Sequence, residues 1–478
     1  MIRIEVILGF IGRILVILGL AMLSCVAVSW YYREDVLWSL LWAALLPLGL
    51  GLFLTIFYRK VEQFSYKEGF LIVSLAWIAA SAFGAVPYLF TNSVTGLANA
   101  FFETASGFST TGASVIADVE GLPKGVQYWR CLTNWMGGMG IIALFVAVIA
   151  GTGSNANQLF RAETPGPEMD KISPRIRENA KKLWQTYVAL SCLLLVLLNL
   201  LGMDFFDALC HTFSTMATGG FSTKNNSIAY YDSAGIQWVI LLFMFIAGIS
   251  FSDHYLFFKH RNWSVYKKNQ EVRLYVFTSL CLGLIVTSQS AINGLDSLRM
   301  GLFQTISMIT TTGFVVGDYA RWSSLAQVII FLCMFMGACS GSTSGNIKPG
   351  RYLIMFKRMV VELKKMVHPR AVYNTKIGGK TLDASLVSNV MVFFFIWMVL
   401  VVLGMLLLAW SGQDLLTSIS ASASCLGNVG PGFGQVGPAT TYAALSSSSK
   451  WVLSFLMLVG RLELYPLLII FTPSYWRE

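Results

Sequence analysis

The chain has 478 residues, of which 55% are hydrophobic and only 12% are charged, and its net charge is +10. Soluble proteins carry about 25% charged residues, so a soluble chain of this composition could not bury its apolar surface. Soluble cytosolic, secreted and disordered classes are therefore excluded. The basic excess is attributed to membrane topology rather than to nucleic-acid binding, and an all-α polytopic membrane protein is predicted.

Long apolar runs indicate where the membrane-spanning helices lie. A spanning helix needs about 20 apolar residues, and ten runs, the last interrupted by Arg461 and Glu463, predict about ten transmembrane helices. The third run is too long for one span and must contain a further element. In chain order the runs cover residues 14–32, 36–58, 69–102, 131–160, 183–203, 233–252, 274–295, 322–347, 384–413 and 451–473.

The loop charges predict the orientation of the chain in the membrane. If the N-terminus is cytoplasmic, the inner loops near residues 59–68, 161–182, 259–273 and 348–383 hold 23 Lys and Arg against 9 Asp and Glu. The outer segments then hold 6 basic and 11 acidic residues. Because basic loops stay inside, we expect both termini in the cytoplasm. This bias explains the basic loops without a requirement for anionic membrane lipid.

A short Thr/Gly pattern occurs four times between the predicted spans, always on the outer side. Each occurrence follows a stretch of helical length, at residues 97–108, 205–215, 297–309 and 415–425. Each unit is therefore a spanning helix, a short re-entrant helix, a loop and a second spanning helix. An internal repeat of this kind determines the architecture of a chain.

The repeat predicts how the chain is divided. Two extra N-terminal transmembrane helices precede four pseudo-symmetric helix–pore helix–helix repeats, which surround one ion pore. The expected division is residues 1–64 for the extra helices and residues 65–160, 183–258, 270–366 and 380–478 for the four repeats.

The four loops have the composition of a cation selectivity filter. A cation that leaves water needs its hydration shell replaced, and backbone carbonyls supply uncharged oxygen ligands. Glycine permits the backbone conformations that turn carbonyls toward an axis. One such loop could simply be a helix contact, but four at regular spacing favour a filter. The predicted filter residues are Thr110, Thr111, Gly112, Ala217, Thr218, Gly219, Thr311, Thr312, Gly313, Asn428, Val429 and Gly430.

The second spanning helix of the third repeat is interrupted by small polar residues. Glycine and serine lower helix propensity and leave backbone groups in need of partners. The segment over residues 337–348 is either an intramembrane loop that gates the path below the filter or the cytoplasmic end of a short helix. The candidate gate residues are Gly337, Ser340, Gly341, Ser342, Thr343, Ser344, Gly345 and Lys348.

Two arginines lie in or next to predicted spans. Arg461 lies near the middle of the last span, where a lone charge is costly and usually faces a cavity or a partner. It is predicted to be a pore-facing barrier to cations. The alternative is an ion pair with Glu463, although side chains at i and i+2 point to different sides of a helix. Arg130, at the outer end of its helix, is expected to be a structural ion-pair partner.

Several motifs match one known family along the whole chain. They are Thr-Thr-Gly-Ala-Ser at 110–114, Ala-Thr-Gly-Gly-Phe-Ser at 217–222, Thr-Thr-Gly-Phe at 311–314, Asn-Val-Gly-Pro-Gly-Phe-Gly at 428–434, Trp-Met-Gly-Gly-Met-Gly-Ile at 135–141, Gly-Ser-Thr-Ser-Gly-Asn-Ile-Lys at 341–348 and Gly-Arg-Leu-Glu-Leu at 460–464. By these motifs the chain resembles the Trk/Ktr superfamily of potassium transporters, specifically its TrkH-type membrane subunit.

This resemblance implies potassium uptake across the bacterial inner membrane by a homodimer in which each protomer carries its own pore. The potassium ion is the implied ligand, and membrane lipid surrounds the protein. The implied regulator is a cytoplasmic TrkA-type subunit that binds nucleotide. It would be a separate polypeptide, since this chain has no Rossmann fingerprint. The resemblance also favours the gate over the helix end at residues 337–348.

Other functions remain open at this stage. Sodium- or proton-coupled potassium symport is an alternative within transport. A secondary transporter of an organic solute usually shows inverted repeats with broken helices, and it is disfavoured because these four repeats run in the same direction. We expect no enzymatic activity, because no catalytic constellation is present, and no nucleic-acid partner.

Overall fold

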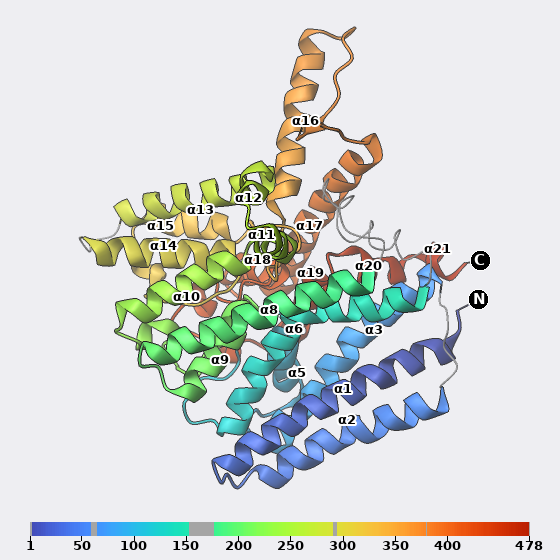
Figure 1. The fold of residues 1–478 in the computed structure, drawn as a ribbon, viewed down its shortest axis with the longest axis vertical. Coiled ribbons are helices and arrows are strands. Elements are labelled where there is room, and N and C mark those ends of the chain that lie inside the picture. The colour runs from blue at the N-terminus through green and yellow to red at the C-terminus, as the bar shows by residue number, and fades with distance from the viewer. Residues whose placement is uncertain (1, 59–64, 153–175, 290–293, 379, 478) are drawn as a thin grey trace.

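The chain is built almost entirely of helices (Figure 1). The computed structural model describes residues 2–58, 65–152, 176–289, 294–378 and 380–477. Within these ranges one antiparallel strand pair occurs, formed by β1 (Lys376–Ile377) and β2 (Lys380–Thr381). The predicted all-α class is confirmed.

Two long helices precede the pore. They are α1 (Ile4–Tyr31) and α2 (Leu37–Phe57), which lie side by side at the edge of the molecule (Figure 1). Small residues bring them together: a Cβ on Gly12 would lie 2.7 Å from the Cβ of Leu54. Close approach through glycine is a common way for helices to pack in membranes.

The remaining helices extend over the residue ranges of the four predicted units. Over the ranges of the first two they are α3 (Tyr66–Gly84), α4 (Val86–Phe90), α5 (Leu97–Phe108), α6 (Lys124–Thr152), α8 (Ile176–Leu200), α9 (Phe205–Met216), α10 (Ala234–Ala247) and α11 (Phe251–His260), and α12 (Ser264–Lys268) lies between the second range and the third. Over the last two they are α13 (Gln270–Ser288), α14 (Leu295–Ile309), α15 (Ser324–Cys333), α16 (Pro349–Val367), α17 (Ala384–Trp410), α18 (Leu415–Gly427), α19 (Ser447–Arg461), α20 (Tyr465–Leu468) and α21 (Pro473–Trp476). Short 3-10 helices connect them at η3 (Ser227–Tyr230), η4 (Tyr319–Arg321), η5 (Gly434–Val436), η6 (Tyr442–Ala444) and η7 (Ile469–Phe471).

Several spans expected to be continuous are broken. Among the described residues, six helices are long and apolar enough to cross a membrane, or eight if each of two bent pairs counts as one span. The bends are 96° between α10 and α11 and 117° between α19 and α20. The second bend follows from positive φ angles at Glu463 and Leu464. Two further predicted spans correspond to the 29-residue α6 and the 10-residue α15.

Most residues of the four short helices α5, α9, α14 and α18 are buried. On α18, the small residues from Ser420 to Gly427 are all buried, and Ser422 donates a hydrogen bond of 2.8 Å to the Val401 carbonyl. The outer helix α17 instead exposes large apolar side chains such as Phe395 and Leu406. Polar residues inside and apolar residues outside are what a bilayer requires, so the arrangement is that of a membrane protein.

Candidate functional site

The same backbone motif follows each of the four short helices. A non-glycine residue with left-handed φ lies one or two positions after the last helical residue, and a glycine with positive φ follows two positions later. The left-handed residues are Thr110, Thr218, Thr311 and Asn428, with φ of 54°, 51°, 56° and 56°. The glycines are Gly112, Gly220, Gly313 and Gly430, with φ of 77°, 75°, 77° and 102°.

Hydrogen bonds confirm this alignment of the four loops. In each loop the amide between the two positive-φ residues donates to the carbonyl of a serine five positions earlier in the helix. The bonds are Thr111 to Ser106 (2.9 Å), Gly219 to Ser214, Thr312 to Ser307 and Val429 to Ser424 (2.8 Å each).

The second loop is therefore displaced by one residue from its predicted register. Gly220, and not Gly219, is the structural counterpart of Gly112. Ala217, predicted to be a filter residue, caps α9 and precedes the loop, as Ser109 caps α5. The segment Thr218–Gly219–Gly220 contains two consecutive glycines, so the sequence did not distinguish the two registers.

The four loops close into one ring. A Cβ added to any of the four positive-φ glycines would lie within 2.4 Å of a carbonyl oxygen in the next loop. The facing pairs are Gly112 with the Gly219 carbonyl (2.3 Å), Gly220 with Thr312 (2.0 Å), Gly313 with Val429 (2.1 Å) and Gly430 with Thr111 (2.4 Å). Each loop therefore faces the next one in chain order, and the fourth loop faces the first. No space remains for a side chain between neighbouring loops.

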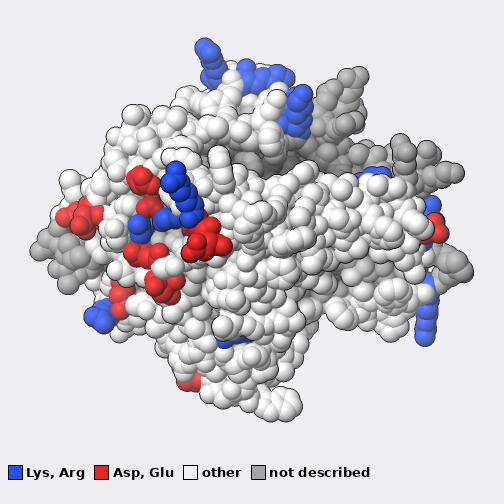
Figure 2. Space-filling view, turned by 90° about the horizontal axis from the view of Figure 1, so that it is seen from below, with Lys and Arg blue, Asp and Glu red and all other residues white. Residues whose placement is uncertain are grey.

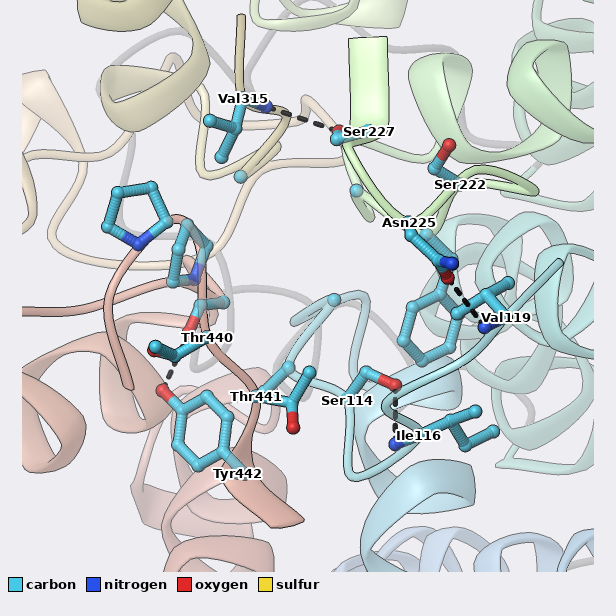
Figure 3. Close-up of a pocket in the computed structure, with 18 of the residues that line it drawn as sticks. Ser114, Ile116, Val119, Ser222, Asn225, Ser227, Val315, Thr440, Thr441 and Tyr442 are labelled. Carbon is cyan, nitrogen blue, oxygen red and sulfur yellow. Dashed lines mark hydrogen bonds between the residues drawn. The ribbon is translucent and has the colours of Figure 1, made fainter. Parts of the chain in front are cut away.

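One pocket with a volume of about 120 Å³ lies against this ring and is lined by all four glycines (Figure 3). Contacts within the fourth repeat and between repeats shape its wall. The Tyr442 hydroxyl donates to the Gly430 carbonyl at 2.7 Å, and the Tyr442 amide donates to the Ser114 carbonyl at 2.9 Å. The Val315 amide donates to Ser227 Oγ at 3.3 Å (Figure 3). The pocket is therefore a shared vestibule built by all four repeats.

Acidic side chains gather on one outer face of the molecule. Figure 2, seen from the side opposite α16, shows Asp and Glu clustered around a few basic residues. Exposed acids in the loops on the vestibule side include Asp118 and Glu120. Hydrogen bonds from the Asn225 side chain and the Gly121 amide hold the pKa of Asp118 below its usual range. Asp118 is therefore an anion at neutral pH and favours cations near this face.

The segment between α15 and α16 lies against the opposite end of the ring. Thr218 Oγ1 donates to Thr343 Oγ1 at 3.3 Å, and Thr343 Oγ1 donates to the Met216 carbonyl at 3.0 Å. Thr311 Oγ1 accepts from the Gly345 amide at 2.9 Å and donates to Ser344 Oγ at 3.3 Å. The segment thus contacts Thr218 and Thr311, the left-handed residues of the second and third loops.

This segment is a loop and not the end of a helix. The helix α15 ends at Cys333, and Met336 pairs with Ile347 in a parallel bridge that closes the base of the loop. At that base, the Gly337 amide donates to the Ile347 carbonyl at 2.9 Å. The predicted alternative, a cytoplasmic helix end over these residues, is wrong.

Polar contacts hold the predicted gate residues in place. The Gly341 carbonyl, at a residue with φ of 78°, accepts from the Phe251 amide at 3.1 Å, beside the break between α10 and α11. Ser342 Oγ bonds within the loop to the Cys339 carbonyl, and Lys348 Nζ donates to the Ser344 carbonyl.

Glu271 binds the loop over residues 337–348, and the sequence did not predict this role. Its Oε1 accepts from the Ser340 amide and hydroxyl, both at 2.9 Å, and from the Gly350 amide at 3.1 Å. The carboxylate therefore joins the loop to the start of α16. Nothing in the sequence around Glu271, which lies in a predicted inner loop, pointed to this role.

Arg461 reaches the loop from the end of α19. Its side chain is 3% exposed and donates to the carbonyls of Thr343 (2.6 Å) and Gly137 (2.8 Å). Glu463 pairs with Arg351 instead. The predicted alternative of an Arg461–Glu463 pair is thus contradicted, and the guanidinium is bound by the uncharged carbonyl groups of Thr343 and Gly137.

Comparisons with known proteins agree with this geometry. The family model for the cation transport protein TrkH matches residues 51–478. The Trk system potassium uptake protein TrkH of Salmonella typhimurium is 39% identical over 427 residues, covering 88% of each chain. The protein of that name from Vibrio parahaemolyticus is 37% identical over 492 residues, covering 99% of each chain. The crystal structure of the potassium transporter TrkH from Vibrio parahaemolyticus matches with a TM-score of 0.91 and 34% identity over the whole of both chains. The chain therefore belongs to the TrkH family of cation transport proteins.

Proposed function

We propose that this protein is the ion-conducting membrane subunit of a Trk-type potassium uptake system. The observation that carries the proposal is the closed ring of four glycine-bearing loops. The similar proteins are named potassium uptake proteins, and no enzyme is among those described above. Potassium is then the transported substrate.

Potassium would bind where the four loops face one another. The carbonyls of Thr111, Gly219, Thr312 and Val429 lie at the contacts between neighbouring loops, and such oxygens can replace the hydration shell of the ion. The four short helices end at these loops, so the negative ends of their dipoles favour a cation there. The proposed filter comprises residues 110–112, 218–220, 311–313 and 428–430.

The loop over residues 337–348 would be the gate. Its Thr343 and Ser344 contact the filter loops on the side away from the vestibule, and Arg461 donates to the Thr343 carbonyl. A cation that leaves the filter would meet this loop and a positive charge. Opening then requires the loop to move away, which breaks these hydrogen bonds.

The remaining assignments concern partners and orientation. The relatives are named as parts of a Trk system, which supports regulation by a separate cytoplasmic nucleotide-binding subunit of the TrkA type. We assign a homodimer in the bacterial inner membrane with both termini in the cytoplasm. The excess of Lys and Arg in the four loops predicted to be cytoplasmic supports this orientation.

Rubidium flux into liposomes that contain the purified protein tests the proposal. We expect uptake down the cation gradient, competition by potassium that is stronger than by sodium or lithium, and no dependence on an imposed sodium or proton gradient. Protein-free liposomes are the control. Flux that requires one of those gradients would indicate symport, and saturable uptake of an organic solute without rubidium flux would overturn the proposal.

A further inference from the structure

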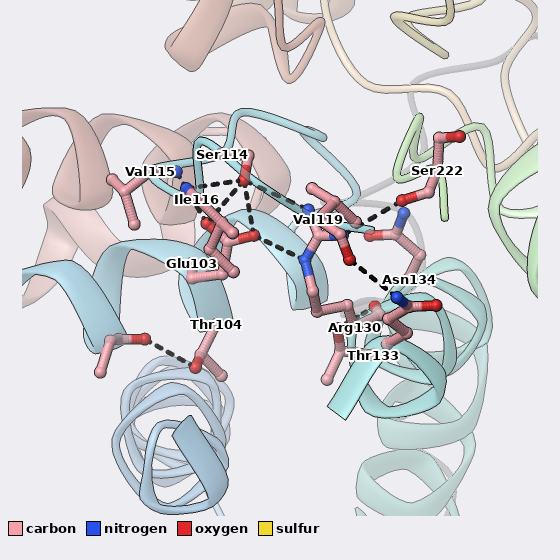
Figure 4. Close-up of polar contacts among 12 residues, drawn as sticks. Glu103, Thr104, Ser114, Val115, Ile116, Val119, Arg130, Thr133, Asn134 and Ser222 are labelled. Carbon is pink, nitrogen blue, oxygen red and sulfur yellow. Dashed lines mark hydrogen bonds and ion pairs between the residues drawn. The ribbon is translucent and has the colours of Figure 1, made fainter. Parts of the chain in front are cut away.

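A buried ion pair lies behind the first two filter loops (Figure 4). Arg130 Nε on α6 is 2.8 Å from Glu103 Oε1 on α5, and the two side chains are 2% and 0% exposed. Removing two charges from water costs several kcal/mol per ion, so a pair at this depth needs good geometry to persist. The expectation that Arg130 is a structural ion-pair partner is confirmed, but its contacts go further.

The carboxylate of Glu103 holds the outer part of the first loop. Ser114, two residues after Gly112, donates its hydroxyl to both carboxylate oxygens at 2.9 and 3.1 Å. The Val115 amide donates to Oε2 at 2.8 Å. Three hydrogen bonds thus fix the extended segment that follows the first glycine of the ring.

Arg130 extends the same network to the second loop. Its NH1 donates to the Ser222 carbonyl at 3.2 Å, and its guanidinium lies 4.3 Å from the centre of the Phe221 ring. Ser222 follows Gly220 by two residues, as Ser114 follows Gly112. NH2 of the same guanidinium donates to Ser114 Oγ at 3.2 Å. One ion pair therefore joins Ser114 and Ser222, which occupy equivalent positions after the glycines of two neighbouring loops (Figure 4).

The other repeats carry different groups at the position of Glu103. In each short helix, the carbonyl of one serine accepts a hydrogen bond from the loop, and the equivalent position lies three residues before that serine. The groups at this position are the carboxylate of Glu103, the imidazole of His211, the amide of Gln304 and the methyl group of Ala421. His211 Nε2 lies 2.9 Å from Ser222 Oγ, and Gln304 Nε2 donates to the Phe314 carbonyl at 3.5 Å. The four quarters of the ring are therefore supported unequally.

We propose that the Glu103–Arg130 pair is a specificity-determining positioning element that fixes the distance between filter loops one and two. This inference rests on the proposed function. Sodium is smaller than potassium, so a carbonyl ring that contracts loses its preference for the larger ion. A multiply hydrogen-bonded ion pair resists such contraction, whereas a single weak hydrogen bond does not.

Two variants test the inference by the ratio of rubidium to sodium flux in liposomes. Glu103→Gln combined with Arg130→Gln removes both charges, so that neither is left buried alone. Ser114→Ala removes the bridging hydroxyl and leaves the ion pair intact. We expect both to conduct rubidium. The ratio should fall about fivefold or more in the double variant and by a smaller factor in Ser114→Ala, as expected for lost hydrogen bonds.

Glu68→Gln is the matched control, because it removes the carboxylate of another ion pair, with Arg3 at 2.9 Å, away from the filter loops. It should keep the parental ratio. A folded double variant with the parental ratio would overturn the inference. If the double variant does not fold, a parental flux ratio in Ser114→Ala is sufficient to overturn the inference. Failure of the parent to conduct rubidium would instead contradict the proposed function.

Discussion

The four positive-φ glycines are the residues of the ring least able to accept a side chain. Each combines two independent constraints: a backbone conformation that side chains disfavour and a carbonyl oxygen within 2.4 Å of any added Cβ. The first constraint affects local stability, whereas the second acts directly on the proposed ion ligands. The two can be separated, because Gly412 has φ of 88° but no heavy atom within 4 Å of an added Cβ.

Gly313→Ser is expected to reduce the preference for potassium over sodium. Its Cβ would lie 2.1 Å from the Val429 carbonyl and 2.9 Å from Pro431 Cδ, so the fourth loop must shift. We expect a loss of selectivity of about tenfold, which corresponds to about 1.4 kcal/mol. Competitive rubidium uptake by the purified variant measures it. Gly412→Ser, which strains the backbone only, should retain selectivity, and an unchanged preference in Gly313→Ser would contradict the filter assignment.

Arg461 should act as a barrier and as a support of the gate. Two unit charges about 5 Å apart repel by roughly 3 kcal/mol at an effective dielectric near 20, and water will screen part of this. Arg461→Ala removes the charge and both hydrogen bonds to carbonyls, so rubidium flux should rise. Arg461→Lys keeps the charge but not the planar fork, so its flux should stay closer to that of the parent.

Flux per folded protein, with folding checked by gel filtration, distinguishes these outcomes. A folded Arg461→Ala variant that conducts no faster than the parent would show that Arg461 is not a barrier. Poor folding of both variants would instead indicate a purely structural role, since buried carbonyl groups would lose their donor.

At the scale of elements, the short helices were predictable and the breaks in the long ones were not. The expected stretches at 97–108 and 205–215 nearly coincide with α5 and α9, because loop glycines and charged residues mark their ends. The bend between α10 and α11 lies inside a continuous apolar run. Tertiary hydrogen bonds from Phe251 and Cys339 stabilise it, and such contacts leave no local pattern in the sequence.

Removal of residues 340–345 should open the proposed gate. The flanking residues Met336 and Ile347 are already paired, so a shortened loop can close without moving α15 or α16. The deletion removes the hydrogen bonds of Thr343 and Ser344 to the proposed filter loops and one of the two carbonyl acceptors of Arg461. We expect higher basal rubidium flux with only a small change in the potassium-to-sodium ratio. A folded deletion variant with parental flux would refute the gate assignment.

At the scale of the whole molecule, composition and the long apolar runs predicted a polytopic membrane protein, and the repeat predicted four loops in equivalent positions. The closure of the ring could not be predicted, because it depends on contacts between loops about a hundred residues apart in the chain and, between the fourth loop and the first, about three hundred. The proposed orientation places α16 and the gate on the cytoplasmic side and the vestibule outside. A regulator would then act on the side from which α16 projects (Figure 1).

Cysteine labelling tests this orientation. Val372, in the loop after α16, is 90% exposed, and Asp232, between η3 and α10, is also exposed. A membrane-impermeant maleimide should modify Val372→Cys in inside-out vesicles only and Asp232→Cys in right-side-out vesicles only. The parent protein, with its own eight cysteines, gives the background. The reverse pattern would contradict the proposed topology.

The central claim is that four loops form one potassium site, and rubidium diffraction tests it most directly. Crystals of the protein grown with rubidium should show an anomalous peak inside the ring formed by the carbonyls of Thr111, Gly219, Thr312 and Val429. Crystals of Gly313→Ser should show a weaker or displaced peak. A well-ordered ring without rubidium density at saturating concentration, or rubidium bound elsewhere in the molecule, would contradict the account.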